Sequence, residues 1–403
     1  MSESPLERAR RAILRSSHRA TGLDEFRADV DAALRPLVGW DVAAWSTTDP
    51  ATLLFTSCVL IGMDEDHDAE QRLFELEFRA DDVNRIRDLA PARVPAATLH
   101  AATGGDLSRS VRWRELLGAL GVTDELRAVF RDREDCWGAL AAYRFGGPPF
   151  TPADVDLLAA LSPVIADGLR RGMLRDAAAE PPGLPAGSDA PGVLVADGSG
   201  AVAETTPQAA YWLAQITGAS AVVPSVIRSV AAAARAAAAG RGDQPAQARL
   251  PRRDGGWLLL HGSALDPASP GVGDSAGSGA EPPSRVAVVI EPARQVHLAD
   301  VMVRAYGLTA REREITEQVL QGRSTQDIAE RLHISPYTVQ DHLKSILAKA
   351  DVSSRRDLVA ELFGRHYAPA TRGGALPSPY GWYNPSAASA ASAASADPVQ
   401  RVV

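Results

Sequence analysis

Residues 308–355 read LTAREREITEQVLQGRSTQDIAERLHISPYTVQDHLKSILAKADVSSR, and this stretch decides the fold class of the C-terminal part of the chain. Thr309 stands three residues before Glu312. This is the spacing of a capping box, in which each side chain accepts a hydrogen bond from the other residue's amide. Gly322 then supplies a residue at which the helix can end in the left-handed conformation. The stretch therefore opens with a helix bounded at both ends.

Three further helix starts follow. Ser324 stands three residues before Asp327 and caps the second helix, and Ser335-Pro336 supplies the N-cap and first residue of the third. Ser353 or Ser354 caps a fourth helix. Each start agrees with the apolar spacing after it, and the buried stripe of the third helix comprises Val339, Leu343, Ile346, Leu347 and Ala350. The sequence predicts an all-α, four-helix helix-turn-helix.

The third helix, Ser335 to Ala350, keeps a polar face outside this apolar stripe. The face consists of Thr338, Gln340, Asp341, Lys344, Ser345 and Lys349, and it carries both lysines of the whole chain. A polar helix face held out by a small helical core is what the major groove of duplex DNA admits. The pattern therefore favours DNA binding.

The same stretch resembles the LuxR-type helix-turn-helix over its whole length. The resemblance implies that the helix from Ser335 reads DNA and that the last helix supports a homodimer, with Leu358, Leu362 and Phe363 as candidate contacts. It also implies a set of DNA-facing residues, with the last four of them near phosphates: Thr338, Gln340, Asp341, His342, Lys344, Ser345, Lys349, Arg355, Ser324, Thr325 and Gln326.

The sequence departs from the family pattern at two places. Gln340 and Asp341 stand where a basic or neutral residue is common, and Asp341 repels phosphate although it can accept from cytosine N4. Ala350 and Asp351 stand where Leu and Gly are usual. The charge of Asp341 predicts modest affinity for a monomer and dependence on dimerisation, and Ala350 and Asp351 predict thinner packing at that end of the helix. His342 lies on the flank of the buried stripe, where packing or a phosphate contact is favoured over a role as a ligand or pH switch.

Charge and composition bound the rest of the chain. The 403 residues carry a net charge of −8, but residues 304–365 hold ten Lys and Arg against nine Asp and Glu and are near +1. This near neutrality predicts a shallow dependence of DNA binding on salt. No apolar run is long enough for a membrane span or a signal peptide, and two cysteines make neither a disulfide framework nor a zinc site. We expect a cytoplasmic, nucleoid-associated protein without membrane contact.

Breaks in composition divide the chain into three compact blocks. Gly, Pro, Ala or Ser enrichment marks a linker at 176–191, a loop at 266–284 and a disordered tail at 367–403. The expected order is a helical arm (1–20), an α+β domain (21–175), the linker, a second α+β domain (192–292), a connecting helix (293–306) and the helix-turn-helix (307–366). The connecting helix either transmits a signal or only spaces the domains.

Both α+β blocks alternate helix and strand signals, and each predicts a mainly antiparallel sheet. The first block is similar to GAF-like sensor domains, most clearly in Trp137 to Leu140 and in FTPADVDLLAALSPVIADGLRRG at 150–172. The second resembles a degenerate PAS-like domain, from GVLVADGSGAV at 192–202 to VAVVIEPAR at 286–294. Such folds often bind small ligands or dimerise. No residue set names a cofactor, a metal site or an effector.

The sequence thus predicts a transcriptional regulator that binds double-stranded DNA, with RNA polymerase as a further candidate partner. An enzyme is disfavoured because the chain has no phosphate-binding glycine loop, HExxH, CxxC or GxSxG motif. A phosphoacceptor receiver domain is disfavoured because the first block is antiparallel in pattern. A protein-interaction module whose helix-turn-helix has lost DNA affinity remains the alternative, because Asp341 opposes DNA binding.

Overall fold

The computed structural model describes residues 4–64, 66–79, 81–132, 135–178, 190–217, 223–242, 245–252, 256–265, 285–293, 301, 304, 306–350 and 352–362. Its contacts group the chain into two compact units, Met1–Pro292 and Ala293–Val403. The expected loop at 266–284 and tail at 367–403, with most of the linker at 176–191 and of the connecting helix at 293–306, lie outside the described residues. The expected domain boundaries therefore stay predictions.

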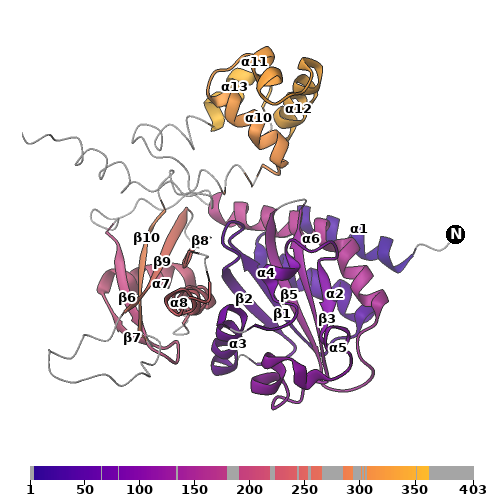
Figure 1. Ribbon diagram of the computed structural model, residues 1–403, viewed down its shortest axis with the longest axis vertical. Helices are drawn as coiled ribbons and strands as arrows, with labels where there is room; N and C mark the ends of the chain where they lie inside the picture. The colour runs from indigo at the N-terminus through magenta and orange to yellow at the C-terminus, as the bar shows by residue number, and fades with distance from the viewer. Residues whose placement is uncertain are drawn as a thin grey trace, which may run out of the picture. The chain divides into compact units, whose positions relative to one another are not determined.

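The first half of unit 1 is a five-stranded antiparallel sheet with helices (Figure 1). The strand order is β2-β1-β5-β4-β3, so the first and last strands of the block are neighbours in the middle. The elements are α1 (Pro5–Arg19), α2 (Leu23–Val38), β1 (Val42–Thr48), β2 (Phe55–Ile61), α3 (His67–Arg79), α4 (Ile86–Leu89), β3 (Ala96–Thr98), α5 (Leu99–Thr103), two short helical turns (Leu107–Arg109 and Trp113–Leu117), β4 (Asp124–Arg131), β5 (Cys136–Arg144) and α6 (Pro152–Ala178).

One face of this sheet is closed by α2 and α6. Trp45 of β1 stacks on Phe130 of β4, and its indole Nε1 donates to Asp31 of α2 at 3.0 Å. Gly168 of α6 lies so close to the Phe26 ring of α2 that an added Cβ would clash with it. The two helices therefore pack tightly against each other and against this face.

The second half of unit 1 is another five-stranded antiparallel sheet, with order β7-β6-β10-β9-β8. Counted within its own block, the order is the same as in the first sheet. The elements are β6 (Gly192–Ala196), β7 (Val202–Thr205), α7 (Pro207–Thr217), α8 (Ser225–Ala238), β8 (Gln247–Pro251), β9 (Trp257–Leu265) and β10 (Arg285–Pro292). The expected fold class, two antiparallel α+β parts followed by an all-α part, is confirmed.

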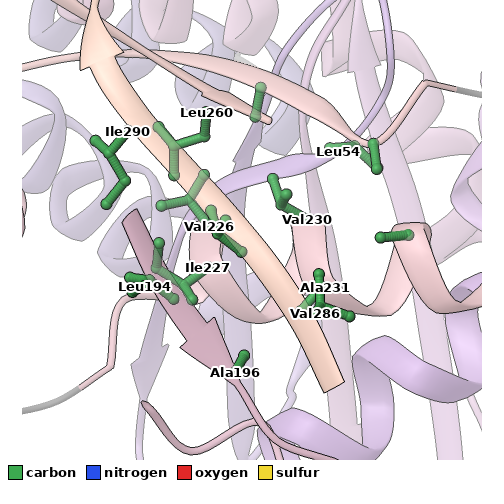
Figure 2. Close-up of a cluster of buried hydrophobic side chains, with 14 of the residues drawn as sticks. Leu54, Leu194, Ala196, Val226, Ile227, Val230, Ala231, Leu260, Val286 and Ile290 are labelled. Atoms are coloured by element: carbon green, nitrogen blue, oxygen red, sulfur yellow. The ribbon is translucent and has the colours of Figure 1, made fainter. Parts of the chain in front are cut away.

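Helix α8 lies between the second sheet and the first block, because it contacts β9 and β10 on one side and β2 and α3 on the other. Every residue from Val226 to Ala236 is buried, as expected of a helix covered all round. Its alanines allow this close approach. Leu54 of the first block lies within the same apolar cluster as Leu194, Val230 and Val286 (Figure 2).

A fully buried ion pair also joins the two sheets. Asp49, in the β1–β2 turn, accepts from Arg249 Nη2 of β8 at 2.8 Å, and both side chains are 0% exposed. The Asp49 carboxylate also accepts from the Arg249 backbone amide at 2.9 Å. Thr52 donates to the Gln247 carbonyl oxygen, and Ser229 of α8 accepts from the Phe55 amide. The two sheets therefore share one interior.

Unit 2 is a small helical core. It contains α10 (Ala310–Leu320), α11 (Thr325–Arg331), α12 (Pro336–Lys349) and α13 (Arg355–Leu362). Their buried apolar residues are Leu308, Ile315, Val319, Ile328, Ala329, Val339, Ile346, Ala350 and Leu358. The four predicted helices are present, and each starts directly after its expected cap residue, with Ser354 the cap at the fourth.

Across the described residues of both units, no helix combines the length and the apolar character needed to cross a membrane.

Candidate nucleic-acid interface

Side-chain caps set the start of each of the first three helices of unit 2. Thr309 and Glu312 form the predicted capping box of α10. Ser324 and Asp327 form a second box at α11. At α12, Ser335 Oγ accepts from the Thr338 amide at 3.0 Å, and Pro336 is the first residue. The chain therefore fixes where α12 starts, and with it which side chains point outward.

Helix α12 has one face in the core and one in solvent. Val339 and Ile346 are fully buried. Gln340, Asp341 and Lys344 are exposed, at the i, i+1 and i+4 spacing of a single helix face. Their side chains make no hydrogen bond or ion pair with any residue that the structure describes. The three groups are available to bind an external partner.

Two of the residues expected to face DNA are instead held within the domain. Glu312 of α10 accepts from Ser345 Oγ and from Lys349 Nζ of α12, both at 2.6 Å. Burial alone would raise the pKa of Glu312, but the hydrogen bonds from Lys349, Ser345 and the Thr309 amide outweigh it and lower the pKa to about 2. The Glu312 carboxylate is therefore ionised and ties α10 to α12. Unlike Lys344, both Lys349 and Ser345 have their side chains hydrogen-bonded within the domain.

The residues expected near phosphates occupy the helix ends. Ser324 is an exposed cap residue, whose hydroxyl donates to Asp327 at 2.7 Å. Thr325 is half-buried, and exposed Gln326 donates to Glu330 at 2.9 Å. Arg355, the first residue of α13, donates to the Arg323 carbonyl oxygen. Each of these groups except Thr325 thus already has an intramolecular partner.

Thr338 and His342 on α12 are half-buried, beside the exposed face. Thr338 Oγ1 lies 2.8 Å from Ser335 Oγ and so belongs to the cap. The half-buried position of His342 agrees with its expected place on the flank of the buried stripe.

The candidate dimer residues on α13 differ in what they can offer. Leu358 is fully buried in the helical core, so its side chain stabilises the domain instead of facing a second copy. The side chain of Leu362 and the whole of Phe363 lie outside the described residues.

Tyr337 is an exposed residue that the sequence reasoning missed. It is the second residue of α12, and 72% of it is exposed. It stands three residues before Gln340 and therefore on the same helix face. An aromatic residue at an outward helical position was the available signal, because tyrosines are seldom left so exposed.

These features define a helix-turn-helix protein. Helices α11 and α12 form the motif, and α12 has an exposed polar face. A family model described as "Bacterial regulatory proteins, luxR family" matches residues 307–362. The chain belongs to this family of bacterial regulatory proteins.

The sequence relatives each match over a short segment of this chain. The spore germination protein GerE of Bacillus subtilis is 42% identical over 55 residues, which are 14% of this chain and 74% of GerE. The monoamine regulon transcriptional regulator of Klebsiella aerogenes is 49% identical over 53 residues, 13% of this chain and 23% of that protein. A putative HTH-type transcriptional regulator of Mycobacterium bovis is 48% identical over 59 residues, 14% of this chain and only 7% of that protein.

Two solved structures are similar to part of the chain at 14% sequence identity. One contains residues 122 to 287 of a methyl-accepting chemotaxis protein, with a TM-score of 0.28, and covers 40% of this chain and 97% of that one. The other is a phycoerythrobilin-bound GAF domain from a cyanobacterial phytochrome, with a TM-score of 0.29, covering 43% and 98%. Likeness at this level carries no argument, so the GAF-like and PAS-like assignments stay predictions.

Proposed function

We propose that the protein is a transcriptional regulator that reads duplex DNA in the major groove with the helix from Ser335 to Ala350. The observation that carries the proposal is the unpaired, exposed face of α12, with Gln340, Asp341 and Lys344. Gln can form two hydrogen bonds with adenine, and Lys is attracted to guanine edges and to phosphates. Tyr337 extends this face toward the start of the helix.

Ser345 and Lys349 have a different role in the proposal. Their bonds to Glu312 set the angle of α12 on α10, so they position the reading face. With Lys349 neutralised by Glu312, Lys344 is the lysine available to phosphate or base. This leaves few phosphate contacts and a shallow salt dependence.

The regulator acts as a homodimer in the cytoplasm, and its N-terminal sheets modulate it. Dimerisation would compensate for the charge of Asp341, because two half-sites add their binding free energies. Because Leu358 is buried, the proposed dimer contact rests on the other two candidates, Leu362 and Phe363. Sedimentation of the full chain carrying Leu362→Glu tests this, and we expect the dimer to be lost. An unchanged dimer would show that Leu362 does not contribute to the dimer contact.

The DNA-reading proposal is tested by selecting bound fragments from the source genome and titrating them at two salt concentrations. Lys344→Ala should weaken every site alike and reduce the salt slope by about one. Gln340→Ala should relax one base position, at a cost of about 1–3 kcal/mol. Asp341→Asn should tighten binding, because it removes repulsion from the phosphates.

The control is Gln321→Ala, an exposed glutamine at the end of α10 that should leave affinity and specificity unchanged. If the full chain selects nothing above random DNA at low salt, the proposal fails. The protein-interaction alternative would then stand, with the exposed Asp341 as its contact.

A further inference from the structure

A cavity of about 350 Å³ lies on the second face of the first sheet, opposite α2 and α6. Its walls come from β1, β2, β5 and α3 of the first block. Ile216, Thr217 and Val223–Ser225, at the end of α7 and the start of α8, supply another wall from the second block. The volume falls in the ~300–1,000 Å³ range of small-molecule sites.

Small side chains on the central strands make this face hollow. Two cross-strand pairs face the cavity, Ala44 with Ala141 and Ser46 with Ala139. Trp45, which stands between Ala44 and Ser46 in β1, points to the opposite face, where its large side chain stacks on Phe130. Ala141 is only half-buried although β5 is the middle strand of the sheet, because its face opens on the cavity.

The rim of the cavity is apolar and exposed. Met63 is 46% exposed, Leu120 38% and Phe145 37%. These are three of the nine large apolar side chains left exposed among the described residues. Apolar side chains gathered at one opening mark a surface that receives an apolar partner.

Two hydroxyl groups of the wall, those of Ser46 and Tyr143, make no hydrogen bond with any residue that the structure describes. Tyr143 of β5 is 6% exposed and lines the cavity. The Tyr143 hydroxyl oxygen is not among the fully buried atoms that lack a partner, so it keeps some accessible surface. Burial also raises the pKa of Tyr143, so its hydroxyl is protonated and can donate. The wall therefore offers a donor to an acceptor inside the cavity.

The charged groups of the wall are already engaged. Arg127 pairs with Glu77 and Glu125. Glu70 pairs with Arg228 and accepts from Ser225. The Asp66 carboxylate accepts from the backbone amides at the start of α3. A charged ligand would lose its hydration without meeting an unpaired counter-ion, which disfavours it strongly.

We infer that this cavity binds a neutral, largely apolar small molecule with one hydrogen-bond acceptor, which the Tyr143 hydroxyl engages. The inference deepens the proposed function, because it gives the N-terminal sheets a defined signal to receive. A ligand there contacts residues of both blocks, and so it stabilises their packing against each other.

The test uses the full chain without DNA and the neutral fluorophore Prodan, whose carbonyl oxygen accepts hydrogen bonds and whose emission shifts to the blue when that bond is lost. Saturable binding to the unaltered protein is expected. Tyr143→Phe should weaken binding about five- to tenfold and shift the bound emission to the blue. Ala141→Leu should fill the cavity and abolish binding. The anionic fluorophore 1-anilinonaphthalene-8-sulfonate should bind at least tenfold more weakly.

Tyr211→Phe is the matched control, because it removes a tyrosine hydroxyl of α7 that does not line the cavity, and it should leave Prodan binding unchanged. Tyr143→Phe removes an unpaired hydroxyl and should keep the unfolding midpoint, so its result is interpretable even if Ala141→Leu folds poorly. Absence of Prodan binding, or equal affinity and emission in wild type and Tyr143→Phe, would overturn the inference. Because no DNA is present, failure of the DNA-reading proposal leaves this result unaffected.

Discussion

Glu312 joins two helices through three hydrogen bonds to one carboxylate. Its oxygens accept from the Thr309 amide at the start of α10 and from Ser345 and Lys349 on α12. The side chain is almost entirely buried, so losing one donor leaves a charge without compensation. The angle between the capped helix and the reading helix therefore depends on one residue.

The stability of unit 2 should fall in acid through Glu312. Its pKa is lowered from an ordinary 4.5 to about 2, so its contribution is complete above pH 4.5 and is lost as the pH falls toward 2. We expect a loss on the order of 2 kcal/mol over that interval. Urea unfolding of the full chain, followed by hydrogen exchange in α10 and α12 peptides, measures it.

Glu312→Gln is the comparison for this pH dependence. The variant should be less stable at neutral pH, and its stability should fall less steeply below pH 4.5. Asp327 and Asp357, whose pKa values are lowered by the cap hydroxyls of Ser324 and Ser354, remain in both proteins. The difference between the two curves therefore isolates Glu312, and identical slopes would refute its assignment.

At the scale of the elements, α10 and α11 end in the same hydrogen-bond pattern with different residues. The residue after each C-cap is left-handed: Gly322 with φ of 76° and His333 with φ of 55°. The next amide then bonds back into the helix, from Arg323 to the Gln318 carbonyl and from Ile334 to the Ala329 carbonyl. Glycine adopts this conformation without strain, but histidine does not.

Substitutions at these two left-handed residues should change the free energy of unfolding of unit 2 in opposite directions. His333→Gly should stabilise unit 2 by up to about 1 kcal/mol, and Gly322→Ala should destabilise it by about 1 kcal/mol. The same unfolding measurement reports both. A Cβ added at Gly322 would meet no atom within 4 Å, so the left-handed backbone conformation is the only cost of alanine there. Stabilisation by Gly322→Ala would therefore contradict the argument.

The helix ends were predictable because their signals are local. A cap and its partner stand three residues apart, so Thr309–Glu312, Ser324–Asp327 and Ser335–Pro336 fix three helix starts without tertiary information. The bonds from Ser345 and Lys349 to Glu312 span more than thirty residues. Nothing near Lys349 in the sequence distinguishes a lysine that faces DNA from one that pairs within the domain.

At the scale of the whole molecule, the Asp49–Arg249 pair holds the two sheets together. Asp49→Asn should destabilise unit 1 by about 3–5 kcal/mol, because it leaves the Arg249 charge buried and unpaired. Chemical denaturation followed by tryptophan fluorescence tests this, since Trp45 and Trp137 report on the first sheet and Trp212 and Trp257 on the second.

The exposed pair of Glu204 and Arg285 is the control, and Glu204→Gln should cost less than about 1 kcal/mol. The two sheets should also lose structure in a single transition, because they share one interior. Two separate transitions, or an Asp49→Asn effect as small as that of Glu204→Gln, would count against this.

The shared interior was not predictable from the sequence. Strand alternation and turn residues within each block predicted two antiparallel sheets, and both are present. Nothing in either block's pattern indicated that Leu54 and α8 would join the two in one apolar cluster. Contacts between residues about 200 positions apart, such as Asp49 with Arg249, leave no periodic signal in either segment. The small residues Ala44 and Ala141 likewise give no sign that they line a cavity.

The order of the strands has a mechanical consequence. In the second sheet, Gly192 at the start of β6 pairs with Ile290 near the end of β10. In the first sheet, Val42 at the start of β1 pairs with Tyr143 near the end of β5. Tension between the two ends of either block would therefore pull neighbouring antiparallel strands apart from one edge. The hydrogen bonds would break one pair at a time, as in a zipper, and each sheet would open along its middle at low force.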